Sequence, residues 1–114
     1  MAEKIQYIGI DELADFEKSE FKELCLKYYN DFIRDLKNEV LMVVHIKTHR
    51  KTEEKEIKKE IQASRKSIHY SIHVRVEIPS IIFEAKENGY ENPVFILKNV
   101  FKKIEKEMGR RLRE

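Results

Sequence analysis

The four histidines of the chain form two pairs with the same spacing, and they are the first residues that could carry chemistry. His45 and His49 are four apart, and so are His69 and His73. Residues four apart in a strand are separated by ~13 Å, so neither pair can share one zinc ion. Only a pair from two neighbouring strands could, and two histidines without a carboxylate or thiolate make a poor zinc site. The pattern favours a polar face that contacts water or RNA, with no metal and no cofactor.

A second group of candidate residues is the set of cations near the end of the chain. Residues 95–114 hold seven Lys/Arg and three Asp/Glu, and Lys98, Lys102 and Lys106 recur every four residues. Such a row is also typical of an ordinary solvated helix face. As a binding surface it would contact phosphates with a strongly salt-dependent affinity, by shape and backbone rather than base sequence. The residues that we assign to RNA binding are Lys98, Lys102, Lys103, Lys106, Arg110, Arg111 and Arg113, with His69, His73 and Arg75 as a secondary surface.

Catalysis is not expected from this sequence. It has no Gly-rich phosphate loop, no nucleophile elbow and no CxxC motif. Its one cysteine, Cys25, falls on an apolar stripe, which predicts a small core residue rather than a nucleophile. A single cysteine also indicates a reducing compartment. No apolar run approaches the length of a membrane span, and residues 1–9 have no signal-peptide core, so we expect a cytoplasmic protein that contacts no membrane.

The elements that must position these residues follow from the spacing of apolar side chains. Residues 4–10, 39–49, 67–78 and 80–86 are typical of strands, and residues 67–78 alternate strictly between apolar and polar. A turn is expected at Asn88-Gly89. The apolar stripe of the first predicted helix, capped by Asp11 or Asp15, consists of Phe21, Leu24, Cys25, Tyr28, Phe32 and Leu36. The stripe of the last predicted helix, which begins at Asn92-Pro93, consists of Leu97, Val100, Phe101, Ile104, Met108 and Leu112.

The element order is therefore β-α-β-β-β-α, an α+β fold. At 114 residues the chain has room for one domain, residues 1–114, with one core. The first two strands should be parallel and the others antiparallel. Since each helix has one apolar stripe, both helices should pack on one face of a four-stranded sheet. The charged stretch 50–66 should form either a mobile hairpin loop or a short helical turn around Ile57 and Ile61.

Charge is unevenly distributed along the chain. The net charge is +2, but residues 1–39 hold six Lys/Arg and ten Asp/Glu, a net of 6 − 10 = −4. Residues 95–114 have a net of 7 − 3 = +4. A polarised molecule of this kind tends to direct its basic end toward phosphates or acidic partners.

With these elements in place, the chain resembles the ribosome hibernation-promoting factor family, also called ribosome-associated inhibitors, in its short form. The resemblance rests on the opening strand and long helix (Ile5 to Leu36), the Val-rich strand Val40 to Ile46, and the stretch from Tyr70 through Phe83-Glu84-Ala85 into the helix Pro93 to Leu112. It implies a fold related to double-stranded-RNA-binding domains. It also implies binding to the small ribosomal subunit in the channel used by mRNA and tRNA, which silences translation under stress. The residues Lys98, Lys102, Lys103, Lys106, Arg110 and Arg111 would then contact ribosomal RNA.

Two features depart from the family pattern and leave alternatives open. The first predicted helix is acidic where the family usually adds basic residues, and the stretch 50–66 is longer than the family's usual hairpin. One alternative is a general structured-RNA-binding module. Another is a protein-interaction module without an RNA role, in which the acidic helix docks a basic partner and residues 50–66 mediate homodimerisation. Reversing the charge at Lys102, Lys106 and Arg110 is expected to abolish RNA association and to leave the fold intact.

Overall fold

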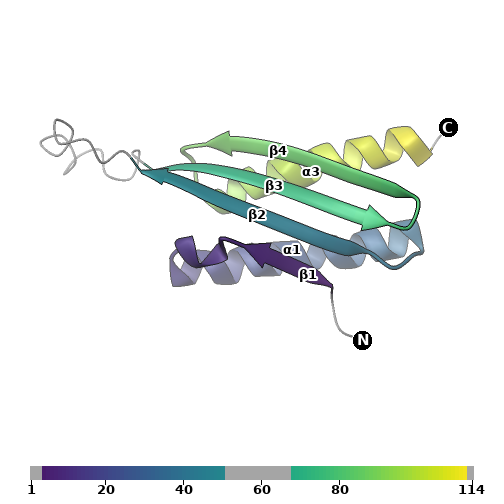
Figure 1. Cartoon of the computed structure of the whole chain (residues 1–114), viewed down its shortest axis with the longest axis horizontal. Coiled ribbons are helices and arrows are strands. Elements are labelled where there is room, and N and C mark those ends of the chain that lie inside the picture. Colours follow the sequence, from purple (N-terminus) through teal and green to yellow (C-terminus); the bar gives the residue numbers. More distant parts are fainter. Residues whose placement is uncertain (1–3, 51–67, 113–114) are drawn as a thin grey trace, which may run out of the picture.

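The computed structural model describes residues 4–50 and 68–112, and it has the predicted element order β-α-β-β-β-α (Figure 1). The predicted loop, apart from Arg50, and the candidate cation Arg113 lie outside these residues. The elements are β1 (Ile5–Ile8), a short 3₁₀ turn (Ile10–Glu12), α1 (Asp15–Leu36), β2 (Leu41–Arg50), β3 (Ile68–Ile78), β4 (Ile81–Gly89) and α3 (Pro93–Leu112). Neither α1 nor α3 is long and apolar enough to cross a membrane.

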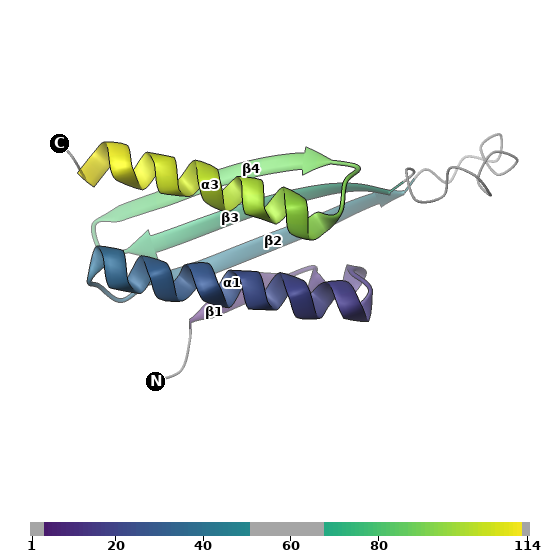
Figure 2. The same cartoon turned by 180° about the vertical axis from the view of Figure 1, so that it is seen from behind.

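The four strands form one mixed sheet in the order β1-β2-β3-β4. The strands β1 and β2 are parallel, and β3 runs antiparallel to both β2 and β4, as the sequence predicts. Both helices, α1 and α3, cover the same face of this sheet, and no helix formed by the described residues lies on the other face (Figures 1 and 2). We call the uncovered side the open face.

The core lies between the helices and the covered face of the sheet. Alternate residues of β2 and β3 point into it, and Val44, Ile72 and Val74 are fully buried. The apolar stripes of both helices are buried as predicted, apart from the half-buried Leu24 and Leu36 and apart from Leu112, whose side chain is not described. Three buried helix residues fall outside the predicted stripes, namely Tyr29, Pro93 and Ile96. The hydroxyl of Tyr29 accepts a hydrogen bond from the Lys4 backbone N–H at 2.9 Å, and Ile96 belongs to the core cluster with Leu97.

The two helices begin differently. The predicted start of α3 is confirmed, because the Asn92 side-chain oxygen accepts a hydrogen bond from the Val94 N–H at 2.8 Å, with Pro93 in the first position. The predicted cap of α1 by Asp11 or Asp15 is wrong. The cap residue is Ala14, whose N–H donates to the Glu17 carboxylate at 3.3 Å. A glutamate at the third helical position can accept the hydrogen bond of the cap N–H, which is one half of a capping box.

The turn expected at Asn88-Gly89 is also absent, because β4 continues through both residues. Asn88 pairs with Ser71 and Gly89 with Tyr70 in the antiparallel register. The long partner strand β3 supplies ladder hydrogen bonds up to this point, and they outweigh the turn preference of the two residues. The chain turns instead after Gly89, on its way to α3.

Gly9, between β1 and the following 3₁₀ turn, is a position where any other residue should destabilise the fold. Its φ is +85°, and a Cβ there would meet the Ile46 carbonyl oxygen at 2.1 Å. We expect Gly9→Ala to lower the free energy of unfolding by roughly 2–4 kcal/mol, because left-handed strain and a backbone clash add. Urea denaturation measures the loss. Ser19→Ala, at an exposed position of α1, should change stability by less than about 0.5 kcal/mol. Equal stabilities for the two variants would contradict the placement of Gly9.

Cys25 is fully buried on α1, as predicted, and burial raises the pKa of its thiol from 9.0 to about 12, partly offset by a hydrogen bond with Tyr7. Its thiolate fraction at pH 8 should therefore be about 1,000-fold below that of an exposed cysteine. We expect a disulfide reagent at pH 8 to label the native protein far more slowly than the protein in guanidinium.

The raised pKa of the Cys25 thiol also makes the free energy of unfolding depend on pH in the alkaline range. The native thiol holds its proton more tightly than the unfolded thiol, so its contribution to stability is complete below pH 9 and is lost as pH rises toward 12. The Cys25→Ala variant should therefore lose stability less steeply than the wild type above pH 9. If the stabilities of the two proteins fall equally steeply above pH 9, or if the native thiol is labelled rapidly at pH 8, Cys25 is not buried with a raised pKa.

Candidate nucleic-acid interface

The outer face of α3 carries three exposed lysines, Lys98, Lys102 and Lys106, which we call the lysine row. A spacing of four residues advances ~6 Å along a helix, so the row is ~12 Å long. None of the three forms an ion pair with a residue in the ranges 4–50 and 68–112. Their ammonium groups can therefore contact a phosphate without first breaking an ion pair with any carboxylate of the described residues.

The other cations assigned to α3 have intramolecular partners. Lys103 Nζ lies 2.9 Å from a Glu87 carboxylate oxygen and donates to the Lys86 carbonyl at 3.2 Å, which ties α3 to β4. Glu107 pairs with Arg111 at 3.2 Å and with Arg110 at 3.9 Å. The predicted surface thus divides into an unpaired row and three paired cations. Exposed pairs of this kind hold by less than about 1 kcal/mol, so a stronger anion can replace the carboxylate.

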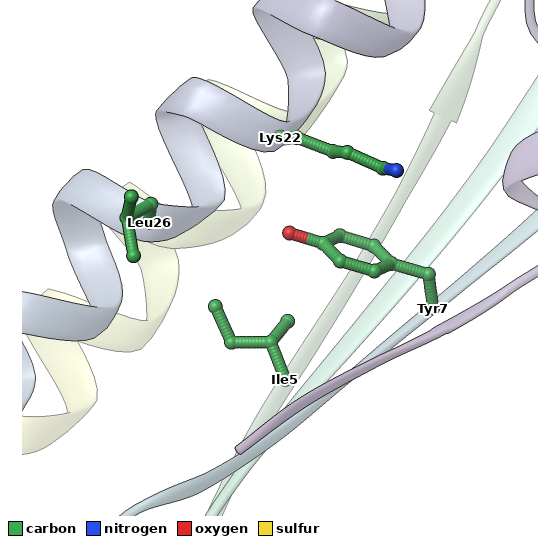
Figure 3. Close-up of a pocket in the computed structure, with 4 residues that line it drawn as sticks. All are labelled: Ile5, Tyr7, Lys22 and Leu26. Carbon is green, nitrogen blue, oxygen red and sulfur yellow. The ribbon is translucent and has the colours of Figure 1, made fainter. Parts of the chain in front are cut away.

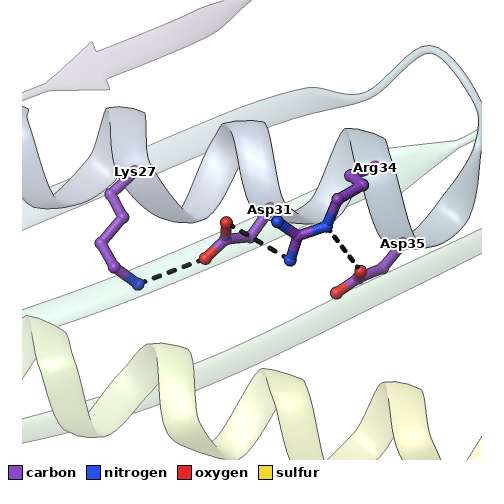
Figure 4. A network of polar contacts seen from close by, with 4 residues as sticks. All are labelled: Lys27, Asp31, Arg34 and Asp35. Atoms are coloured by element: carbon purple, nitrogen blue, oxygen red, sulfur yellow. Dashed lines mark hydrogen bonds and ion pairs between the residues drawn. The ribbon is translucent and has the colours of Figure 1, made fainter.

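The helix α1 does not extend this basic surface. Figure 4 shows Asp31 between Lys27, at 3.2 Å, and Arg34, at 3.6 Å, with Asp35 on the other side of Arg34 at 3.3 Å. Lys18 also pairs with carboxylates, those of Asp11 and Asp15. The cations of α1 are therefore largely compensated by acids on or beside the same helix.

The predicted secondary surface lies on the open face, opposite the lysine row. All four histidines point to this side, as the strand alternation predicts, and His45 faces His73 while His49 faces His69. Arg75 is on the same face and pairs with Glu77 at 3.6 Å. Because the sheet separates His69, His73 and Arg75 from α3, one flat ligand cannot contact both surfaces at once.

A small hollow on the open face brings together residues that the sequence alone did not connect. It measures about 130 Å³ and is lined by His45, Lys47, Ser71, His73 and Lys86. We call it the sheet pocket. Lys47, Ser71 and Lys86 were not among the residues predicted to bind RNA. The alternation of each strand indicates that these three side chains point to the open face. It does not indicate that they lie side by side, because that depends on the register between the strands.

Two further hollows lie on the helix side of the sheet. One, of about 280 Å³, lies between β1 and α1 and is lined by Ile5, Tyr7, Lys22 and Leu26 (Figure 3). Lys22 Nζ lies 5.6 Å from the centre of the Tyr7 ring, which gives this site one cation–π contact and little else that could orient a ligand. The other, of about 580 Å³, lies between the starts of α1 and α3 and includes Ile68, where the described chain resumes.

Neither metal nor thiol chemistry is supported by the part of the chain that the structure describes. It contains no group of three or more His, Cys, Asp or Glu side chains placed to hold a metal ion. Cys25 is buried, and its thiol stays protonated at neutral pH. The candidate residues on α3 and on the open face are cations and imidazoles, and these recognise anions.

Comparison with protein-family models, with curated proteins and with solved structures finds no match for this chain. The resemblance to the hibernation-promoting factors, and the relation to double-stranded-RNA-binding domains that it implies, therefore stay predictions. A functional assignment has to be argued from the residues of this chain.

Proposed function

We propose that this protein binds the RNA of the small ribosomal subunit through α3 and silences translation in the manner of a hibernation factor. The observation that carries the proposal is the lysine row, three exposed ammonium groups at helical spacing with no carboxylate partner among the described residues. Double-helical RNA offers phosphates along a groove edge, and it is recognised by shape and backbone rather than by base sequence.

The fold supports the same proposal without deciding it. A four-stranded mixed sheet with two helices on one face is the architecture that the sequence resemblance implies. The compensated charges of α1 restrict the contact to one helix. We therefore expect a smaller basic footprint than a protein with two basic helices would have, and a correspondingly smaller salt dependence of binding.

Sedimentation with ribosomes in sucrose gradients at graded salt tests the proposal. We expect the protein to co-migrate with the small subunit at low salt and to dissociate as salt rises, and to inhibit translation in a reconstituted system. Equal affinity for any duplex RNA would favour the general RNA-binding module instead. No RNA binding at all would favour the protein-interaction module, for which the acidic α1 is the docking candidate.

A cytoplasmic location belongs to the same proposal, since ribosomes act in that compartment and a free cysteine is typical of it. Fractionation of cells that produce the protein should recover it with ribosomes at low salt and with the soluble fraction at high salt.

A further inference from the structure

The sheet pocket on the open face is built from three strands by their register. His45 of β2 faces His73 of β3, which faces Lys86 of β4. In the neighbouring row, Lys47 faces Ser71. Since opposite residues on one sheet face have Cβ atoms about 5 Å apart, these five side chains converge on one spot.

The chemistry of the pocket selects an anion. Two ammonium groups, a hydroxyl and two imidazoles line it, and no carboxylate does. Glu84 is engaged with His73, whose Nε2 lies 2.8 Å from the Glu84 Oε1, and this carboxylate orients the His73 ring. Neither Lys47 nor Lys86 forms an ion pair with a described residue. At about 130 Å³ the hollow holds roughly four waters' volume, which suits one phosphate group.

Two histidine rings lie beside the pocket on the same face, and the ring of Tyr90, just after the end of β4, adjoins one of them. His49 and His69 face each other in the register, with ring centres 6.0 Å apart, and the rings of His69 and Tyr90 meet edge to face with their centres 5.0 Å apart. Tyr90 is 49% exposed, so part of its ring is open to solvent. His49 and His69 are two residues along their strands from Lys47 and Ser71, a distance of ~7 Å. An exposed aromatic ring next to a phosphate site is the combination that binds single-stranded nucleic acids.

We propose that the open face of the sheet is a second binding site, specific for nucleotides of single-stranded RNA. One phosphate occupies the sheet pocket between Lys47 and Lys86, and an adjacent base stacks on the exposed ring of Tyr90. This site lies on the face opposite the lysine row, and it does not rest on the function proposed for α3.

Fluorescence anisotropy with a short, unstructured, labelled RNA tests the site at low salt. The double variant Lys47→Gln/Lys86→Gln removes two phosphate contacts and should weaken binding about 20-fold, with a salt slope reduced by about 1.4. Tyr90→Ala removes the exposed ring and should weaken binding at least about fivefold. The matched control is Lys22→Gln/Lys27→Gln, which removes the same charge from α1 and should change the affinity less than about threefold. Melting temperatures establish that each variant is folded.

Competition with small ligands shows whether the site recognises a nucleotide or only a phosphate group. Adenosine monophosphate should displace the labelled RNA at lower concentration than inorganic phosphate, because it supplies a base as well as a phosphate. Equal displacement by the two, together with an unaffected Tyr90→Ala variant, would overturn the stacking site. Equal weakening by the sheet and α1 double variants would also overturn the proposal, since only general charge would then be acting.

The outcome is independent of the ribosome experiment. A wild-type protein that sediments with the small subunit but binds no single-stranded RNA would refute the sheet site alone. Single-stranded RNA binding that persists when the lysine row is neutralised would support it, whatever the result with ribosomes.

Discussion

Neutralising the lysine row should remove most of the affinity for ribosomal RNA. The variant Lys98→Gln/Lys102→Gln/Lys106→Gln loses three phosphate contacts, each of which contributes ~0.9 to the slope of log affinity against log salt. Three contacts give a slope change of about 3 and an affinity loss of about 100-fold near 0.15 M salt. Quantitative sedimentation or filter binding over a salt series gives both numbers.

This variant is designed to leave the fold unchanged. All three lysines are exposed and have no ion-pair partner in the described ranges, and glutamine has nearly the helix propensity of lysine. Thermal melts of wild type and variant should therefore agree closely, and circular dichroism should report the same helix content.

The matched control moves the same charge change to the other helix. Lys22→Gln/Lys27→Gln/Arg34→Gln also lowers the net charge by three, but Lys27 and Arg34 are already held by Asp31. We expect this control to weaken binding less than about threefold. If both triple variants lose affinity equally, net charge rather than the row determines binding; if the lysine-row variant binds like wild type, α3 is not the interface.

A second comparison tests whether ion pairing matters on α3 itself. Neutralising Lys103, Arg110 and Arg111 removes as many charges from the same helix, but Glu87 and Glu107 compensate these cations. Their loss should therefore cost less affinity than loss of the row. The charge reversal at Lys102, Lys106 and Arg110 changes two unpaired lysines and one paired arginine together. The lysine-row variant changes unpaired cations only, so it separates the two effects.

The element order could be derived from the sequence because its signals are local. Strict alternation from Ser67 to Ile78 has only one physical interpretation, a strand with one buried face, and Asn92-Pro93 fixes the start of α3 by its own hydrogen bonding. The outward position of the four histidines followed from the same alternation.

The features that escaped prediction are those set by partners distant in the sequence. Asn88 and Gly89 have turn propensity, yet pairing with Ser71 and Tyr70 keeps them in β4. The sheet pocket depends on the register that places His45 beside His73 and Lys47 beside Ser71, and the sequence of two strands far apart in the chain does not fix how they align. Likewise, whether Lys103 is free or paired depends on where Glu87 lies across the helix–sheet contact.

The position of the lysine row depends on how α3 is anchored, and Phe101 is a principal anchor. Its ring is fully buried, stacks on Tyr28 of α1 at 4.4 Å and 13°, and lies 6.0 Å from Phe32. Phe101→Ala should lower the free energy of unfolding by about 3–5 kcal/mol, through lost transfer energy and the cavity that remains. Since small domains are stable by only about 5–15 kcal/mol, this is a large share of the total.

The same helix supplies the control for this variant. Phe95→Ala makes the identical chemical change at a side chain that is 52% exposed, and it should cost less than about 1 kcal/mol. The expected fall in melting temperature is roughly 15–30 °C for Phe101→Ala and a few degrees at most for Phe95→Ala. RNA affinity measured well below the lowered melting temperature should stay near wild type, because the lysines are unchanged. Equal losses of stability in the two variants would mean that the stack between α1 and α3 does not hold the helix in place.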